Sequence, residues 1–317
     1  MAAPTVIRAS PREPESGFCA QTRAVDWRVL SAILFVSILG LWWMLGPQTA
    51  RLWDLWTTNP LSSIGMLVPV VAVVLTVRAW RGRGWERRGT WWGLPVCAAG
   101  LLLACLDKAH QLPFLAHRSA VLHLIPVGAQ VFLYVTGAVL LFAGTRYYRA
   151  ALFPITLLLF LNPAPPFFTS MIDLPLQYAG AHAARSFAGW VGVPLTVDNL
   201  RFMFSPTLGM MVAPGCNGMR GALTMGLLTA VVGHLYGLPW LLRGAYVVSG
   251  IALAYLLNLV RLCGLVLCYR VALDYAPLAT HMSGADYVLG SILFFSAAIF
   301  VLALPRKWKP VSRNTNS

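Results

Sequence analysis

Long apolar runs separated by short polar segments make up most of the chain. The runs cover about residues 29–46, 61–78, 91–107, 121–143, 150–165, 219–237, 243–269 and 284–304. Most of them are close to the roughly 20 apolar residues that a helix needs to cross a bilayer. The pattern therefore predicts an all-α polytopic membrane protein with about eight transmembrane helices.

One long segment, about 166–218, does not follow this pattern. It contains a stretch from Met171 to Val191 that predicts an amphipathic helix. The apolar stripe of this helix would consist of Leu174, Leu176, Ala179, Ala183 and Phe187. Residues 197–204 then alternate like a strand, 206–209 predict a turn, and 210–213 predict a second strand. We therefore expect one amphipathic helix and a short β-hairpin before the sixth span.

Composition supports a membrane protein. Hydrophobic residues make up 58% of the chain and charged residues only 11%, against about 25% charged residues in soluble domains. This excludes an ordinary soluble enzyme, a disordered chain and a small disulfide scaffold. The excess of 24 basic over 10 acidic residues does not predict nucleic-acid binding, because the basic residues lie between apolar runs.

The basic residues instead predict the orientation in the membrane. With the N-terminus in the cytoplasm, the inner segments hold 16 of the 24 basic residues, as the positive-inside rule expects. The sequence thus predicts a multi-pass protein of the cell membrane, in contact with the lipid bilayer and with both termini cytoplasmic. Residues 1–28 form a flexible cytoplasmic tail, 29–304 a single membrane domain and 305–317 a basic cytoplasmic tail. The segment 166–218 lies on the outer side.

Cys216 differs from the other cysteines in its surroundings. It stands in a Pro- and Gly-containing turn, residues 212–221, that leads directly into the sixth predicted span. The N–H groups and the dipole at a helix N-terminus stabilise a thiolate. Two interpretations are open at this point, a nucleophile at the outer membrane interface or a cysteine that only packs in a turn.

One charge lies inside a predicted span. Arg261 is about nine residues below the outer end near Arg270, a depth of roughly 13 Å. A charge at that depth is a functional site by default, although the side chain can also reach outward along its stem. Asn258 shares the helix face of Arg261. Arg220 is shallower, and a structural, headgroup-binding or catalytic role is open for it.

Absent motifs narrow the possible chemistry. All ten acidic residues fall in tails, in loops or near span ends, and no carboxylate lies in the middle of a span. This argues against an intramembrane aspartyl protease and a carboxylate-based ion carrier. There is no HExxH motif and no zinc-type cysteine pair, so we expect no metal and no cofactor. Of five histidines predicted on the outer side, His281 opens the last span and can approach the outer end of the Arg261 helix.

These motifs together resemble the exosortase/archaeosortase family of polytopic membrane cysteine transpeptidases. The resemblance covers about residues 150–304. In order, it consists of the Pro-stopped span 153–165, Asp173-Leu174-Pro175-Leu176-Gln177, Ala213-Pro214-Gly215-Cys216-Asn217-Gly218-Met219-Arg220, Asn258-Leu259-Val260-Arg261 and His281. Many members have Ser after the cysteine and Leu before the arginine, whereas this chain has Asn217 and Met219. We take that difference to concern the subfamily and not the nucleophile.

The resemblance implies an active site and a substrate. The family's catalytic set falls on Cys216, Arg261 and His281, with Asn258, Arg220 and Asn217 in support. The implied substrates are exported proteins with a C-terminal sorting tail, which consists of a short motif, one transmembrane helix and a basic end. The enzyme would cut at the motif on the outer side and pass the new C-terminus to a surface acceptor, in a setting often linked to exopolysaccharide. An acidic motif would bind Arg201, Arg220 or Arg270.

Two other classes of function remain open from the sequence. A polytopic transporter would use Arg261 to bind an anionic substrate, and a scaffold of a polysaccharide export system would need no active site. Cys216→Ser separates them from a transpeptidase, because only the transpeptidase should lose activity.

Overall fold

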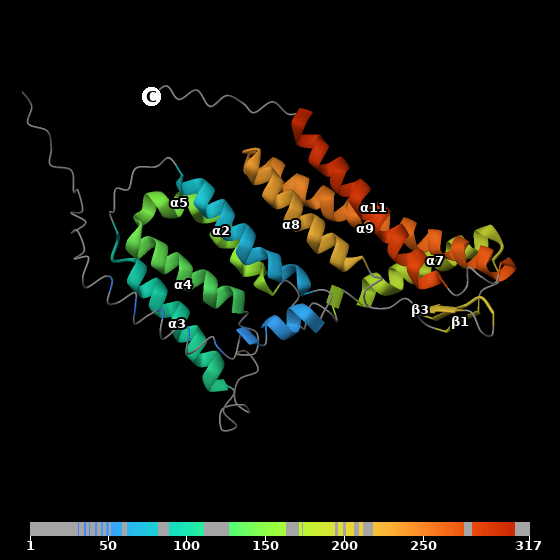
Figure 1. Ribbon diagram of the computed structural model, residues 1–317, viewed down its shortest axis with the longest axis horizontal. Helices are drawn as coiled ribbons and strands as arrows, with labels where there is room; N and C mark the ends of the chain where they lie inside the picture. The colour runs from blue at the N-terminus through green and yellow to red at the C-terminus, as the bar shows by residue number, and fades with distance from the viewer. Residues whose placement is uncertain are drawn as a thin grey trace, which may run out of the picture.

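The chain folds into helices and one small sheet (Figure 1). The computed structural model describes scattered positions between 31 and 50 and then residues 52–58, 62–81, 89–110, 127–162, 171–172, 174–193, 196–198, 201–205, 209–211, 218–275 and 281–307. Within these residues the helices are η1 Ser63–Met66, α2 Leu67–Trp80, α3 Gly93–His110, α4 Val127–Phe142, α5 Gly144–Thr156, η3 Leu157–Leu161, α7 Leu174–Val191, α8 Met219–Leu235, α9 Trp240–Asp274, α11 Met282–Ala303 and η6 Leu304–Lys307.

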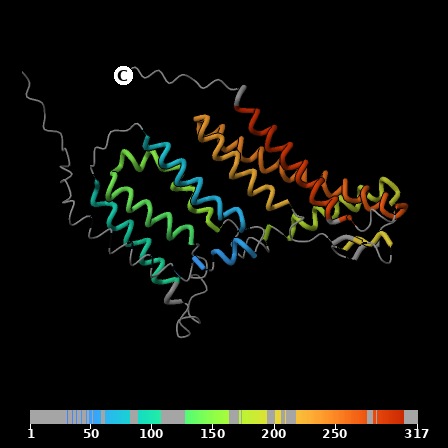
Figure 2. The backbone as a smooth tube through the Cα atoms, viewed as in Figure 1, coloured from blue at the N-terminus to red at the C-terminus, as the bar shows by residue number. Residues whose placement is uncertain are grey.

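The helices of the N-terminal half, α2 to α5, form one group in Figure 2. Helices α3 and α4 approach closely because glycines lie between them. A Cβ on Gly100 would stand 2.8 Å from the backbone nitrogen of Tyr134, which is the small-residue packing common between membrane helices. Helices α2, α5 and η3 share a hydrophobic core that contains Val68, Ala151 and Ile155.

The C-terminal half is built on the long hairpin of α8 and α9, with α11 packed against it. Gly237, at φ 66°, lies in the turn between α8 and α9. The shared core contains Met225, Val232 and Ala254, together with residues of α11. The hydroxyl of Tyr246 donates to the carbonyl oxygen of Val301 at 2.6 Å, which ties the start of α9 to the end of α11.

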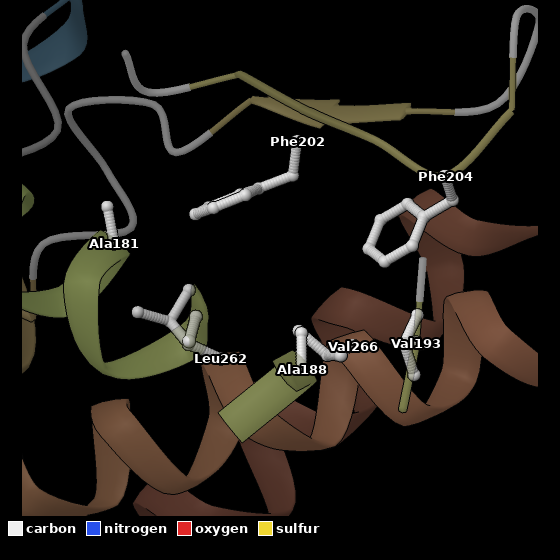
Figure 3. Close-up of a cluster of buried hydrophobic side chains, with 8 residues drawn as sticks. Ala181, Ala188, Val193, Phe202, Phe204, Leu262 and Val266 are labelled. Carbon is white, nitrogen blue, oxygen red and sulfur yellow. The ribbon is translucent and has the colours of Figure 1, made fainter. Parts of the chain in front are cut away.

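A small cap covers the C-terminal part of α9. Its sheet has the order β1-β2-β3, with β1 Thr196–Asp198, β2 Arg201–Met203 and β3 Gly209–Met211 in antiparallel pairing. Figure 3 shows Phe202 and Phe204 directed from the sheet side toward α7 and α9. Phe202 is fully buried and packs in one cluster with Leu262 and Val266 of α9. The cap is therefore held to α9 by apolar side chains.

The cap differs in two details from the sequence-based expectation. The strand expected over 197–204 is two strands, β1 and β2, so the sheet has three strands and not two. Helix α7 is present, but only part of the expected stripe faces the protein, because Leu176, Ala183 and Phe187 are half-buried while Leu174 and Ala179 are exposed. The buried positions are Gln177, Gly180, Ala181, Ala184 and Ala188. Small residues occupy this face because α9 lies close to it, as the 3.1 Å between a Cβ on Gly180 and Leu262 Cδ1 shows.

Three helical segments of the described residues are long and apolar enough to cross a membrane, namely 63–80, 240–274 and 284–303. Shorter apolar helices cover 93–107, 127–142 and 219–235. The mostly helical, membrane-type architecture is thus as expected. The count of eight spans and the cytoplasmic position of both termini stay predictions, and the tail 1–28 lies outside the described residues.

Candidate active site

An arginine and an aspartate from different helices form a bidentate ion pair in the C-terminal half. Arg261 belongs to α9 and Asp286 to the second turn of α11. Nε of Arg261 donates to Oδ1 of Asp286 at 2.8 Å, and Nη2 donates to Oδ2 at 2.7 Å. The two side chains retain 19% and 30% of their accessible surface. Such a paired contact is both strong and specific in its geometry, so it fixes the plane of the guanidinium.

Asp286 was not among the site residues expected from the sequence. It was grouped with the other acidic residues near span ends. The sequence does contain a signal for this ion pair, because a charged residue inside a membrane helix usually pairs with a polar group on a neighbouring helix. Asp286 is the one acidic residue of the last span, 284–304, and that span follows the Arg261 helix directly.

A glycine on α11 makes room for the arginine. A Cβ on Gly290 would stand 3.3 Å from Nε and 3.4 Å from Cδ of Arg261. Gly290 is one turn beyond Asp286, so the side chain of Arg261 lies over Gly290 while its nitrogens bind the carboxylate. Any larger residue at this position would compete with Arg261 for the same space.

Asn258 connects Arg261 to the beginning of α8. Its Oδ1 accepts from Nη1 of Arg261 at 3.4 Å, and its side chain is buried. On the other side of Asn258 lies Gly218, the N-cap of α8, at φ 78°. A Cβ on Gly218 would stand 3.0 Å from Cβ, Cγ and Nδ2 of Asn258. Both the left-handed backbone and the close contact favour glycine here, and they place the start of α8 directly against the Arg261 site.

Arg261 lies well inside α9, which continues past Arg270 to Asp274. One face of the last part of α9 packs against the cap. Counted from Trp240 at the other end, Arg261 lies about 31 Å along α9. This is close to the roughly 30 Å of a bilayer's hydrocarbon core. About 20 Å of α9 follows Arg261, and the depth of Arg261 in the membrane stays a prediction.

The structure brings His281 and Arg220 to the same end of the helix bundle. His281 is the exposed N-cap residue of α11, the helix that carries Asp286. Arg220 is exposed in the first turn of α8, next to Gly218. Three helix segments thus present expected site residues at one level, namely the start of α8, the Asn258–Arg261 turn of α9 and the start of α11.

The two arginines expected to bind substrate lie in or below the cap. Arg201 begins β2, opposite Asp198 of β1, and is exposed. Arg270, near the end of α9, donates to Oδ2 of Asp274 at 2.8 Å in an exposed pair. Exposed pairs of this kind contribute little to stability, so Arg270 can exchange this partner for another anion at small cost. Substrate binding by either residue stays a prediction.

Two expected site residues, Cys216 and Asn217, lie outside the described residues, in the segment 212–217. Four other cysteines are described as free thiols, namely Cys97, Cys105, Cys263 and Cys268. In the part of the chain that the structure describes, no group of three or more His, Cys, Asp or Glu side chains is arranged to hold a metal ion.

Comparison with known families gives one match, to the transmembrane exosortase family model over residues 56–304. The match begins well before residue 150, where the motifs read from the sequence begin, and it includes α2 to α5 as well as the Arg261 site. No curated protein and no solved structure matches the chain. Because the matched residues make up more than half of the chain, the protein belongs to the transmembrane exosortase family.

Proposed function

We propose that the protein is a membrane cysteine transpeptidase that cleaves a C-terminal sorting tail from exported proteins. The observation that carries this proposal is the contact of Gly218 with Asn258, next to the Arg261–Asp286 pair. Two peptide units separate Cys216 from Gly218, so covalent geometry keeps their Cα atoms within about 7.6 Å. In this proposal the thiol of Cys216, so close to Gly218 along the chain, acts together with the guanidinium of Arg261 in one site.

Two features of this site favour a thiolate on Cys216. The cysteine precedes the N-terminus of α8, where unpaired N–H groups carry a partial positive charge. Arg261 adds a permanent positive charge on the neighbouring helix. Both stabilise the charged form of the thiol, which is the nucleophilic form.

The proposed reaction has two steps. The Cys216 thiolate attacks the scissile carbonyl carbon, and the oxyanion that forms is stabilised by Arg261. The C–N bond breaks, the leaving amine takes a proton from His281, and a thioester remains. An acceptor nucleophile then gives its proton to His281 and attacks the thioester, which releases the thiolate. With water as acceptor, the same steps give hydrolysis.

The partners of this reaction follow from the proposed chemistry. The donor substrate is an exported protein whose tail has a short motif, one transmembrane helix and a basic end, and the acceptor is a surface molecule with a nucleophilic group. We place the active site on the outer side of the cell membrane, because the basic residues near the opposite helix ends favour the cytoplasm. The link to exopolysaccharide is part of the same proposal.

The pairing of Arg261 does not favour the transporter alternative. That alternative required Arg261 to attract an anionic substrate within the bilayer. Arg261 is instead paired with Asp286 through two hydrogen bonds. A substrate anion would have to displace that carboxylate, whereas an oxyanion that forms beside the guanidinium does not.

The test compares Cys216→Ala with the wild type at equal membrane abundance, by mass spectrometric mapping of the C-termini of exported proteins. We expect precursors with intact tails to accumulate only in the variant. Cys105→Ala, a half-buried thiol on α3, is the matched control and should process normally. Identical C-termini in Cys216→Ala and wild type would refute the proposal. Normal processing in Cys216→Ser would point to the transporter or the scaffold interpretation.

A further inference from the structure

An open cavity lies at the opposite end of the helix bundle from the Arg261 site. It has a volume of about 340 Å³ and lies between the ends of α2 and α8. Its lining residues are Leu75, Arg78, Ala79, Arg81, His234 and Leu235. The cavity is at the low end of the range for ligand sites, which is about 300–1,000 Å³. It suits a headgroup and not a whole lipid.

The polar side of this cavity is cationic. Arg78 and Arg81 come from the end of α2, and His234 comes from the last turn of α8. Behind His234, the ring of Phe153 stacks on the imidazole at a centroid distance of 4.1 Å. The guanidinium of Arg243 lies 5.5 Å above the same ring. Two arginines and one histidine thus line the opening, and Arg243 lies behind them on the ring of Phe153.

No acidic side chain balances these charges among the described residues. The ion pairs described there join Arg261 to Asp286 and Arg270 to Asp274, both far along α9. Nη2 of Arg243 donates to a backbone carbonyl, that of Leu238, and its Nε is buried without a hydrogen-bond partner in the described structure. An anion that binds between Arg78 and Arg81 is attracted by both guanidinium groups.

The other side of the cavity is apolar and continuous with the lipid-facing surface. Leu75, Ala79 and Leu235 line it, and Leu235 and nearby Val77 are exposed large hydrophobic residues. Trp80, at the end of α2, packs edge-on against Tyr147 at 6.0 Å, and both residue types are enriched at membrane interfaces. A ligand here meets cations on one side and hydrocarbon on the other.

We infer that this cavity binds the phosphate of an anionic phospholipid in the membrane leaflet opposite the Arg261 site. The guanidinium group of an arginine donates two parallel hydrogen bonds to two oxygens of a phosphate. The apolar wall of the cavity accommodates the first part of an acyl chain. Basic pockets between helices on the cytoplasmic side are suited to such headgroups. The positive-inside pattern explains why arginines gather at this end, but it does not by itself require a cavity between them.

The experiment is native mass spectrometry of the purified protein with phosphatidylglycerol or phosphatidylcholine that carry the same acyl chains. We expect the wild type to retain phosphatidylglycerol preferentially. Each basic residue near an anionic headgroup contributes about fivefold, so R78Q/R81Q should reduce that preference by roughly thirtyfold. The control R146Q/R149Q removes the same charge from exposed positions at the start of α5 that do not line the cavity, and it should retain the preference.

Three outcomes would overturn the inference. Equal retention of the two lipids by the wild type would show that the cavity does not select a charged headgroup. An equal loss in R146Q/R149Q would show a diffuse charge effect. Millimolar inorganic phosphate could also displace phosphatidylglycerol and itself be retained by R146Q/R149Q but not by R78Q/R81Q. That result would show a site for a soluble phosphate compound. The wild-type comparison does not depend on whether any variant folds.

Discussion

Asp286 offers the sharpest test of the proposed active site, because its expected role is to hold Arg261 and not to touch the substrate. Asp286→Asn keeps the size of the side chain and one of its two acceptor oxygens. The Nε contact at 2.8 Å can therefore survive, while the second charged hydrogen bond, from Nη2 at 2.7 Å, is lost. The guanidinium should remain in place but move more freely over Gly290.

The size of the effect follows from the geometry of the pair. A hydrogen bond to a charged group contributes about 1.5–3 kcal/mol. Because Asp286 retains 30% of its accessible surface, we use the lower end of that range. About 1.5 kcal/mol corresponds to roughly a tenfold slower reaction. Loss of the whole Arg261 side chain should be more severe, about a hundredfold or more, as for removal of an oxyanion donor.

The assay is a pulse-chase measurement of the processing half-time of a tailed precursor, at matched membrane abundance of each variant. The half-time should lengthen about tenfold in Asp286→Asn. Arg261→Lys keeps the charge but cannot form the forked contact, so Asp286→Asn should have little further effect in that background. An unchanged half-time in the single variant, or the same tenfold effect in both backgrounds, would refute a role of Asp286 through Arg261.

Three further changes probe the packing around the site. Gly218→Ala should slow processing at least tenfold. An alanine in the left-handed conformation costs about 1–2 kcal/mol, and its Cβ would lie 3.0 Å from a neighbouring side chain. The control Gly221→Ala, where a Cβ has nothing within 4 Å, should match the wild type in the same pulse-chase assay. Gly290→Leu should abolish processing by displacing the arginine over it, while Gly284→Leu, at an open position of the same helix, should be tolerated. Phe202→Ala should destabilise the cap by about 3–5 kcal/mol and make its loops sensitive to limited proteolysis in intact vesicles.

The residues that share one helix were placed correctly by spacing alone. Asn258 and Arg261 were expected on one face, and the structure joins them through a hydrogen bond. The amphipathic helix before the cysteine was also expected, and α7 is present at Leu174–Val191. Both expectations rest on the helical period, which depends only on local sequence.

Contacts between helices were not predictable in the same way. The pairing of Arg261 with Asp286 depends on how α9 and α11 pack, which no local pattern encodes. The face of α7 that packs against the protein also depends on a neighbouring helix, and the apolar stripe named from the sequence did not identify it. The packed face instead has Ala181, Ala184 and Ala188, since a close approach to α9 needs small side chains and large ones such as Leu174 remain outside.

The length of α9 explains how one helix can serve both the membrane and the cap. Its first part, from Trp240 to Arg261, is about as long as a bilayer's hydrocarbon core is thick, and one face of the rest packs against Phe202 and Phe204. A substrate tail with a single transmembrane helix would enter the bilayer beside this bundle with its scissile bond just outside the hydrocarbon core. The scissile bond would then lie at the same height along the membrane normal as Arg261, so the substrate helix would not need to unwind to reach the thiol. A spacer of three or four residues inserted between motif and span should then stop cleavage, because it raises the bond by about 10 Å or more in extended chain. Unchanged cleavage of the lengthened substrate would contradict this placement of the active site.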